Sequence, residues 1–343
     1  MKTVVCLCLA LFPCAYTYSQ DGPLFESLSA SKTGVQFKNV LDESPTANVL
    51  TYEYFYNGGG VSVGDINNDG LDDIYFTSNM RPNALYLNKG GFKFENITSS
   101  ANVACDKGWK TGVTMVDINH DGLLDIYVCL SGKGSPDGRR NKLYINNGDL
   151  TFTERAAEYG LDDPGHSTHA SFFDFDRDGD LDMYLLNHNV VVIQEFEFAK
   201  AKKTRHPYAG DKLFRNDNGM FVDISEQAGI KGNSLGFGLG VTVADVNRDG
   251  WLDIYISNDY VEPDYLYINN RDGTFTDRMT EYMQHISYFS MGCDVSDINN
   301  DGFPDIFTLD MLPEDNERQK LLYGPENYEH YALMVLNGFY FQN

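Results

Sequence analysis

The stretch at residues 62–76, SVGDINNDGLDDIYF, determines how the whole chain is interpreted. Between Asp65 and Asp73 it gathers four aspartates, two asparagines and a glycine, with apolar, strand-like residues on both sides. The pattern returns four times, as TMVDINHDGLLDIYV at 114–128, SFFDFDRDGDLDMYL at 171–185, TVADVNRDGWLDIYI at 242–256 and DVSDINNDGFPDIFT at 294–308. A repeat of roughly 50 residues is typical of a propeller or a repeat array.

A second element recurs in phase with the first. It consists of two short alternating apolar runs around an Asn/Gly/Asp turn, which is typical of a β-hairpin. Its four copies are NALYLNKGGFKFENI at 83–97, NKLYINNGDLTFTER at 141–155, DKLFRNDNGMFVDIS at 211–225 and DYLYINNRDGTFTDR at 264–278. One unit is therefore four antiparallel strands, the content of a propeller blade, which buries its faces by stacking on neighbouring blades.

We therefore predict an all-β fold, a β-propeller of four-stranded antiparallel blades with cation-binding loops between strands. Helical pattern is scarce, and only ERAAEYG at 154–160 and DISEQAG at 223–229 are compatible with a turn or two of helix. The segments 188–210 and 311–330 interrupt the period, and we expect both to be surface insertions that carry recognition.

The acidic stretch has a fixed spacing in every copy. Numbered from its first aspartate, each copy fits D-x-[DN]-x-D-G-x-x-D. Oxygens at positions 1, 3 and 5 converge if the chain curls around a point, and glycine at position 6 permits a left-handed turn that aims the position-7 carbonyl inward. An all-oxygen set of this kind suits a hard cation, Ca²⁺ above all.

The predicted ligands at positions 1, 3, 5, 7 and 9 form five sets. They are Asp65, Asn67, Asp69, Leu71 and Asp73; Asp117, Asn119, Asp121, Leu123 and Asp125; Asp174, Asp176, Asp178, Asp180 and Asp182; Asp245, Asn247, Asp249, Trp251 and Asp253; and Asp297, Asn299, Asp301, Phe303 and Asp305. An EF-hand is excluded because position 12 holds no glutamate and the flanks are strands. Turns of this composition also form without a cation, but five intact copies favour about five structural Ca²⁺ sites.

The charge of the chain restricts its possible partners. Fifty acidic residues face 26 basic ones in 343 residues, for a net charge of −24. This excludes a nucleic-acid binder that works by neutralising phosphates, because such a surface is basic. An acidic chain of this size binds cations or simply stays soluble.

The N-terminus has the layout of a secretory signal peptide. Residues 1–19 contain one lysine, an apolar run and small polar residues, which favours cleavage before Gln20 and a propeller over 20–343. The rival is a lipid anchor at Cys14, although the proline before it is unfavourable. No other apolar run reaches the roughly 18 residues of a membrane span. Cys105, Cys129 and Cys293 remain, an odd number without metal-site spacing.

These repeats resemble FG-GAP/VCBS repeats of integrin-α-type propellers. YNGGGVSVGDINNDG at 56–70 and FGLGVTVADVNRDGWLDIYISND at 237–259 are especially similar to the ASPIC/UnbV and cartilage-acidic-protein group, in particular its secreted or outer-membrane members in Bacteroidetes. The resemblance implies a seven-bladed propeller with Ca²⁺ in its inter-strand loops, a role in binding or adhesion and no defined reaction.

The chain departs from that family in its number of repeats. Only five loops are present, and no hairpin follows the fifth, while GVQFKNV at 34–40 resembles the last strand of a hairpin without its first half. Two interpretations follow. The half-units complete a closed five-bladed ring, or the sequence is the N-terminal part of a longer chain, which we favour because an end inside a blade leaves an unpaired edge.

We predict an extracytoplasmic binding or adhesion module for a protein or glycan partner, secreted or held at the cell surface, and not an enzyme. The alternatives are a polysaccharide-acting propeller enzyme and a structural part of a larger surface assembly. No nucleophile elbow, phosphate loop or Cys/His arrangement occurs, and His166 with His169 lacks a third metal ligand.

Two groups of residues are candidates for partner contact. Lys200, Lys202, Lys203 and Arg205 either meet an anionic partner or form a solvated helix face. Trp109 and the YEYFY run at 52–56 either stack on sugars or pack in the core, and core packing is favoured for most of them.

Overall fold

The computed structural model describes residues 25–191, 193, 197–311, 315–321 and 336. The predicted signal segment 1–19, Cys14 and much of the second insertion, 311–330, therefore lie outside the described residues. Within the described part of the chain, no helix is both long and apolar enough to cross a lipid bilayer.

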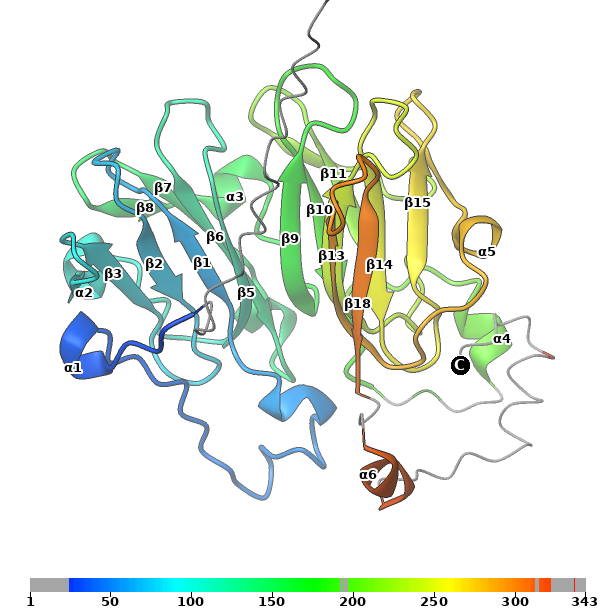
Figure 1. The fold of residues 1–343 in the computed structure, drawn as a ribbon, viewed down its shortest axis with the longest axis horizontal. Coiled ribbons are helices and arrows are strands. Elements are labelled where there is room, and N and C mark those ends of the chain that lie inside the picture. The colour runs from blue at the N-terminus through cyan, green and yellow to red at the C-terminus, as the bar shows by residue number, and fades with distance from the viewer. Residues whose placement is uncertain (1–24, 192, 194–196, 312–314, 322–335, 337–343) are drawn as a thin grey trace, which may run out of the picture.

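Five antiparallel sheets follow one another along the chain, and we call them blades 1 to 5 (Figure 1). Blade 1 comprises β1 (Val61–Gly64), β2 (Asp73–Phe76), β3 (Ala84–Asn88) and β4 (Phe94–Asn96), and blade 2 comprises β5 (Trp109–Val116), β6 (Asp125–Ser131), β7 (Lys142–Asn146) and β8 (Phe152–Glu154). Blade 3 comprises β9 (Ser167–Phe173), β10 (Asp182–Asn187), β11 (Lys212–Asn216) and β12 (Phe221–Asp223), and blade 4 comprises β13 (Gly238–Ala244), β14 (Asp253–Asn258), β15 (Tyr265–Asn269) and β16 (Phe275–Asp277). Blade 5 has β17 (Ser290–Ser296) and β18 (Asp305–Asp310).

The strand order within each complete blade follows the sequence, so the prediction of an all-β fold with four antiparallel strands per unit is confirmed. The helices are single turns: α1 (Ala30–Thr33), η1 (Glu53–Tyr56), α2 (Thr98–Ala101), η2 (Pro136–Arg139), α3 (Ala156–Tyr159), α4 (Phe198–Ala201), α5 (Met279–Tyr282) and the slightly longer α6 (Asn316–Leu321). ERAAEYG contains α3 as expected, whereas DISEQAG forms only turns after its first residue.

The core lies between successive blades. The first strands β1, β5, β9, β13 and β17 contact one another in this order, and each pair of neighbouring blades encloses an apolar cluster. The tyrosine two residues into each second strand is buried in all four complete blades, as Tyr75, Tyr127, Tyr184 and Tyr255. Stacking therefore buries the sheet faces, as a propeller requires.

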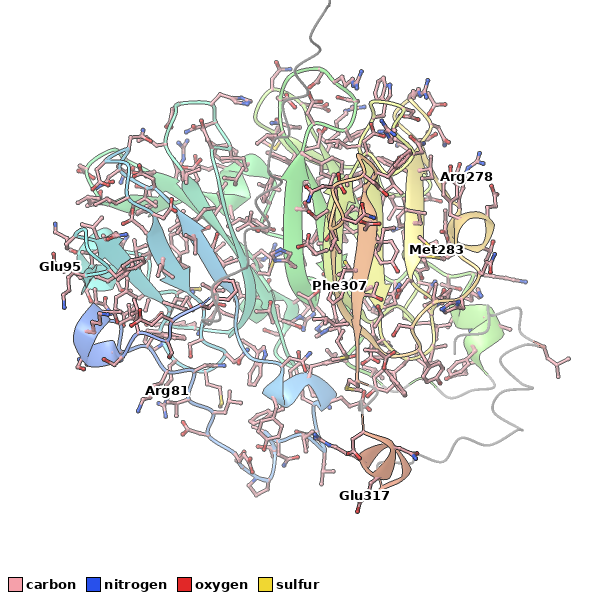
Figure 2. All side chains as sticks on the ribbon, in the orientation of Figure 1. Arg81, Glu95, Arg278, Met283, Phe307 and Glu317 are labelled. Carbon is pink, nitrogen blue, oxygen red and sulfur yellow. The ribbon has the colours of Figure 1, made fainter. Side chains whose placement is uncertain are left out.

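Blade 5 keeps an open apolar face among the described residues. Phe307, which is labelled in Figure 2, occupies the position of those buried tyrosines but is 53% exposed. Leu309 on the same face is 55% exposed. At the other end of the row, Val61 and Val63 of β1 are also exposed. The described residues thus form an open row of blades and not the closed five-bladed ring.

The segment 34–40 does not form the strand that its pattern indicates. It runs beside blade 1, where the ring of Phe37 stacks on Phe76 with centroids 4.8 Å apart and the Gln36 N–H donates to the Tyr86 hydroxyl at 3.2 Å. Alternate residues are exposed, as in a strand, but no ladder of backbone hydrogen bonds pairs them with a neighbour.

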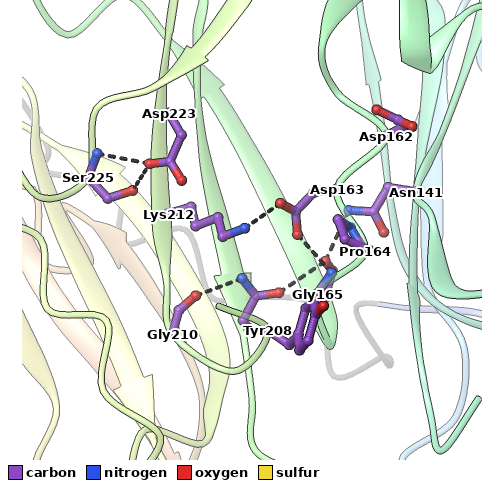
Figure 3. A network of polar contacts seen from close by, with 12 residues as sticks. Asn141, Asp162, Asp163, Pro164, Gly165, Tyr208, Gly210, Lys212, Asp223 and Ser225 are labelled. Atoms are coloured by element: carbon purple, nitrogen blue, oxygen red, sulfur yellow. Dashed lines mark hydrogen bonds and ion pairs between the residues drawn. The ribbon is translucent and has the colours of Figure 1, made fainter. Parts of the chain in front are cut away.

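A polar joint links blades 2 and 3 (Figure 3). Lys212 of β11 forms an ion pair with Asp163, and both side chains are largely buried. The other Asp163 oxygen accepts the Gly165 N–H at 2.8 Å, and the Asp163 carbonyl accepts the Asn141 N–H at 3.1 Å. These contacts fix the connection between the two blades, because a buried carboxylate needs several donors.

Residues 48–57, which we call the strap, cross the ends of blades 2 to 4. Tyr52, Tyr54 and Phe55 are buried there against Trp109 and Phe237. The Tyr52 hydroxyl lies 3.1 Å from His188 Nε2, and the Tyr54 hydroxyl donates to Asp259 at 3.1 Å. Because His188 and Asp259 follow the second strands, the strap lies at the opposite end from the acidic loops. The aromatic run thus packs in the core, apart from the exposed Tyr56.

The first insertion, 188–210, is anchored on the body of the protein. Phe198 of α4 packs against Leu235, and both are buried. Lys200, Lys203 and Arg205 are exposed, and the Arg205 guanidinium also donates to the carbonyls of Ile230 and Asp211. Contact of this basic group with an anionic partner stays a prediction, and so does its alternative, a solvated face.

Candidate metal centres

Each acidic loop joins the first and second strands of its blade and is organised by its position-1 carboxylate. Asp65 accepts the N–H groups of Asp69 at 3.1 Å and Gly70 at 2.7 Å. Asp117, Asp245 and Asp297 accept the same two N–H groups in their loops, and Asp174 accepts those of Arg177 and Gly179. The backbone thus curls around this side chain, which concentrates carboxylate oxygens inside the loop.

Two residues in every loop adopt left-handed backbone. Gly70 at position 6 has φ +83°, and its counterparts are similar. Position 4 is also left-handed in all five loops, at Asn68, His120, Arg177, Arg248 and Asn300, which sequence reasoning did not anticipate. The position-5 carboxylate then accepts the position-7 N–H, as Asp69 does from Leu71 at 2.9 Å.

The position-9 aspartate has a structural role that the motif alone does not reveal. Asp125 is fully buried, and its two oxygens accept the N–H groups of Ile118 at 3.2 Å and Asn146 at 2.8 Å. Asp73, Asp182 and Asp253 repeat both contacts. Through these hydrogen bonds the position-9 aspartate attaches the loop to the hairpin of its own blade, whether or not it also binds an ion.

The third loop brings the most carboxylates together. One oxygen from each of Asp174, Asp176 and Asp182 lies within 4.8 Å of the others, and among the described residues this is the group of His, Cys, Asp or Glu side chains close enough to share an ion. Asp176 Oδ1 and Asp180 Oδ1 are buried without a hydrogen-bond partner. Burial, followed by the nearby Asp178, raises the pKa of Asp180 to about 6, and burial raises that of Asp182 to about 7.

These observations fit a hard cation. Oxygens that are buried, unpartnered and negatively charged are costly unless a positive charge compensates them. The donor set is oxygen only, which is the set that Ca²⁺ prefers. Four loops carry asparagine at position 3, so they assemble fewer carboxylates, although amide oxygen is also a calcium ligand.

Successive loops are connected across the blade boundary. Asn68 Nδ2 donates to the Gly122 carbonyl at 2.9 Å, the Arg177 guanidinium lies 4.5 Å from the Trp251 ring centroid, and that of Arg248 lies 4.4 Å from Phe303. In these three pairs of loops, position 4 of one loop thus contacts position 6 or 7 of the next. The sequence signal was arginine at position 4 one repeat before an aromatic residue at position 7.

Among the described residues, the group of side chains close enough to share a metal ion includes neither His166 nor His169. His169 lies in β9 and not in a loop, where it is half-buried, and burial lowers its pKa. His166 precedes that strand, and burial lowers its pKa to about 4. Cys105, Cys129 and Cys293 are free thiols, and Cys129 is buried in β6 as expected.

Comparison with known proteins identifies similar repeats. A model of the FG-GAP-like repeat matches residues 49–128, 130–185, 204–256 and 245–308. Cartilage acidic protein 1 of Xenopus tropicalis is 30% identical over 210 residues, which are 59% of this chain and 29% of that protein. Mouse integrin alpha-3 is 28% identical over 116 residues, 30% of this chain and 11% of that protein.

Among solved structures, a lectin from Agrocybe aegerita that recognises non-reducing terminal N-acetylglucosamine superposes with a TM-score of 0.43 and 17% identity, covering 76% of this chain and 68% of the lectin. The chain spans less than a third of the length of the cartilage acidic protein that it matches. The narrower resemblance to a bacterial subgroup remains a prediction.

Proposed function

Because the chain belongs to the FG-GAP-like repeat family, we propose that it is a calcium-stabilised binding module that recognises a protein or glycan partner outside the cytoplasm. The observation that carries the proposal is the third loop, where two buried carboxylate oxygens, of Asp176 and Asp180, have no donor. Calcium would supply the missing positive charge.

Hydrogen bonds within the chain hold the carboxylates of the loops in position. Backbone N–H groups hold the position-1 and position-5 carboxylates in place, and the position-9 aspartate attaches the loop to its hairpin. The side chains at positions 1, 3, 5 and 9 and the position-7 carbonyl would hold the ion. Since this ordering exists in the fold, the ion would stabilise the folded state and leave the unfolded chain unaffected.

Support for binding over catalysis comes from a serine–histidine contact near the strap. Ser131 Oγ lies 2.9 Å from His188 Nε2, but both residues are buried beneath Tyr52, and His188 Nδ1 has no partner. A nucleophile and its base need access to substrate and an orienting group, so this pair acts in packing. The exposed loops and insertions are better suited to contact a partner.

Location outside the cytoplasm is supported by the signal-like residues 1–19. Calcium-binding modules of extracellular proteins typically have dissociation constants of about 10⁻⁴–10⁻³ M, so they fill at the millimolar calcium found outside cells. A lipid anchor at Cys14 remains the alternative to free secretion.

The test is thermal unfolding of the full chain with calcium and with chelator, together with a glycan array and a protein pull-down in both conditions. Each ion at a hundred times its dissociation constant stabilises by about 2.7 kcal/mol. We expect a higher Tm in calcium and binding without turnover. An unchanged Tm, or product formed from a polysaccharide, would contradict the proposal.

A further inference from the structure

The five acidic loops differ in the charges that surround them. Resting on the proposed calcium function, we propose that the loop of blade 3, residues 174–182, is the strongest cation site and fills first, and that the loop of blade 4, residues 245–253, is weakened by Arg271. This assigns the order of filling to particular residues of this chain.

The third loop has the largest uncompensated charge. It alone carries aspartate at all of positions 1, 3, 5, 7 and 9, because Asp176 replaces the asparagine and Asp180 the apolar residue of the other loops. Charge count is one of the factors that set the calcium affinity of an oxygen cage. The unpartnered oxygens of both residues lie in this loop.

The other loops satisfy part of their own charge. In the first, second and fourth loops the position-3 asparagine donates Nδ2 to the position-5 carboxylate, for example from Asn119 to Asp121 at 2.9 Å. Asp176 has no N–H to give in this way. A cation therefore gains more in the third loop, where no hydrogen bond between positions 3 and 5 has to be broken.

Nearby arginines do not neutralise the third loop. Arg177 turns to the next blade, over the Trp251 ring. Arg215, whose charge reaches Asp176, binds Asp217 through Nε at 2.7 Å and Nη2 at 3.2 Å. Both guanidinium groups are thus engaged elsewhere, and neither forms an ion pair with a carboxylate of the third loop.

In blade 4, Arg271 of the hairpin competes with a cation for Asp249 of the acidic loop. Arg271 Nη2 lies 2.8 Å from Asp249 Oδ2, and Asn247 donates to the same oxygen at 3.0 Å. The other oxygen of Asp249 accepts the Trp251 N–H at 2.9 Å. Arg271 stands two residues after the hairpin asparagine, where the other complete blades have Gly90, Gly148 and Asn218 and no charge. A cation must therefore share Asp249 with a guanidinium, which lowers its affinity.

Trp251 can serve as a spectroscopic probe of ion binding in the loops of blades 3 and 4. Trp251 is position 7 of the fourth loop and touches Arg177 of the third, whereas the other tryptophan, Trp109, packs against the strap. Terbium, a calcium substitute, emits when a nearby excited tryptophan transfers energy to it. Selective tryptophan excitation therefore reports on the loops of blades 3 and 4.

The experiment titrates the full chain with Tb³⁺ by tryptophan-sensitised emission and with Ca²⁺ by calorimetry. The variants are Asp176→Asn, which gives the third loop the residue of the others, and Arg271→Asn, which gives blade 4 the residue of blade 3. We expect Asp176→Asn to weaken the tightest binding step by roughly tenfold or more, since one unit of charge is lost beside the ion. Arg271→Asn should tighten a weak step several-fold.

Each outcome decides a separate question. If calcium binds but all steps have one affinity, and Asp176→Asn leaves the tightest step unchanged, the order of filling is wrong and the calcium function stands. If Arg271→Asn leaves every step unchanged, the competition at Asp249 is wrong. If the folded wild-type chain binds neither ion, the proposed function itself fails. Circular dichroism of each variant verifies the fold, and Arg271→Asn, at an exposed position, tests the proposal even if Asp176→Asn unfolds.

Discussion

Replacing Asp125 by alanine should destabilise the protein whether or not calcium is present. The residue is fully buried, and its oxygens accept the N–H groups of Ile118 and Asn146. Alanine would leave both N–H groups without an acceptor in a place that water cannot reach. Each such group costs about 1–3 kcal/mol, so the expected loss is about 2–6 kcal/mol in chelator. Calcium should widen the loss, because a ligand disappears as well.

Asp121 in the same loop is the matched control. Its oxygens accept the Leu123 N–H and the Asn119 amide, but the side chain is exposed, so water replaces these contacts in Asp121→Ala. Surface changes of this kind usually cost within about 0.5 kcal/mol. The control should therefore lose stability chiefly in calcium.

The assay is urea unfolding of both variants and the wild type, in calcium and in chelator, with free energies from the linear extrapolation. The reasoning about position 9 is refuted if Asp125→Ala matches the wild type in chelator. It is also refuted if the two variants lose the same amount and only in calcium, because position 9 would then be a ligand and nothing more.

Three further perturbations test joints elsewhere in the fold. Asn146→Ala should lower the free energy of unfolding by about 1–3 kcal/mol, since its amide donates to one carbonyl in its own blade and one in blade 1; no loss in urea unfolding would contradict this. Asp163→Ala should cost about 3–5 kcal/mol because it leaves Lys212 largely buried and unpaired, whereas the added change Lys212→Met should recover most of the loss. Burial lowers the pKa of His188 from 6.5 to about 3, so the unfolded chain binds this proton first and stability falls as pH drops from 6.5 toward 3; His188→Gln should flatten that part of the Tm profile, and an identical profile would rule out the effect.

Much of the fold could be predicted from local pattern. Alternating apolar runs placed the strands, and Gly70 with its counterparts placed the left-handed turns, because both depend on residues close in sequence. The residue whose N–H binds the position-9 aspartate could also have been predicted, because Asn146 and its counterparts begin the turn of each complete hairpin. The motif suggested that the position-9 aspartate is a metal ligand. Only the structure showed that both of its oxygens already accept backbone N–H groups.

Contacts between distant repeats could not be predicted in this way. Arg177 reaches Trp251 because two blades stack, and Tyr52 reaches His188 because the strap crosses three blades. For the segment 34–40, by contrast, the local pattern predicted a strand that the structure does not contain. Its alternation resembles a strand, but a strand needs a neighbour with free N–H and carbonyl groups, which the pattern of one segment does not report.

The strap also has a consequence for synthesis on the ribosome. Tyr54 is made early, yet its partner Asp259 follows 205 residues later. At about 5–20 residues per second, this delay is roughly 10–40 seconds, during which the burial site of Tyr54 is incomplete. Early blades can form in that interval, but the nascent chain must keep this short aromatic segment from sticking to other proteins until the fourth blade emerges.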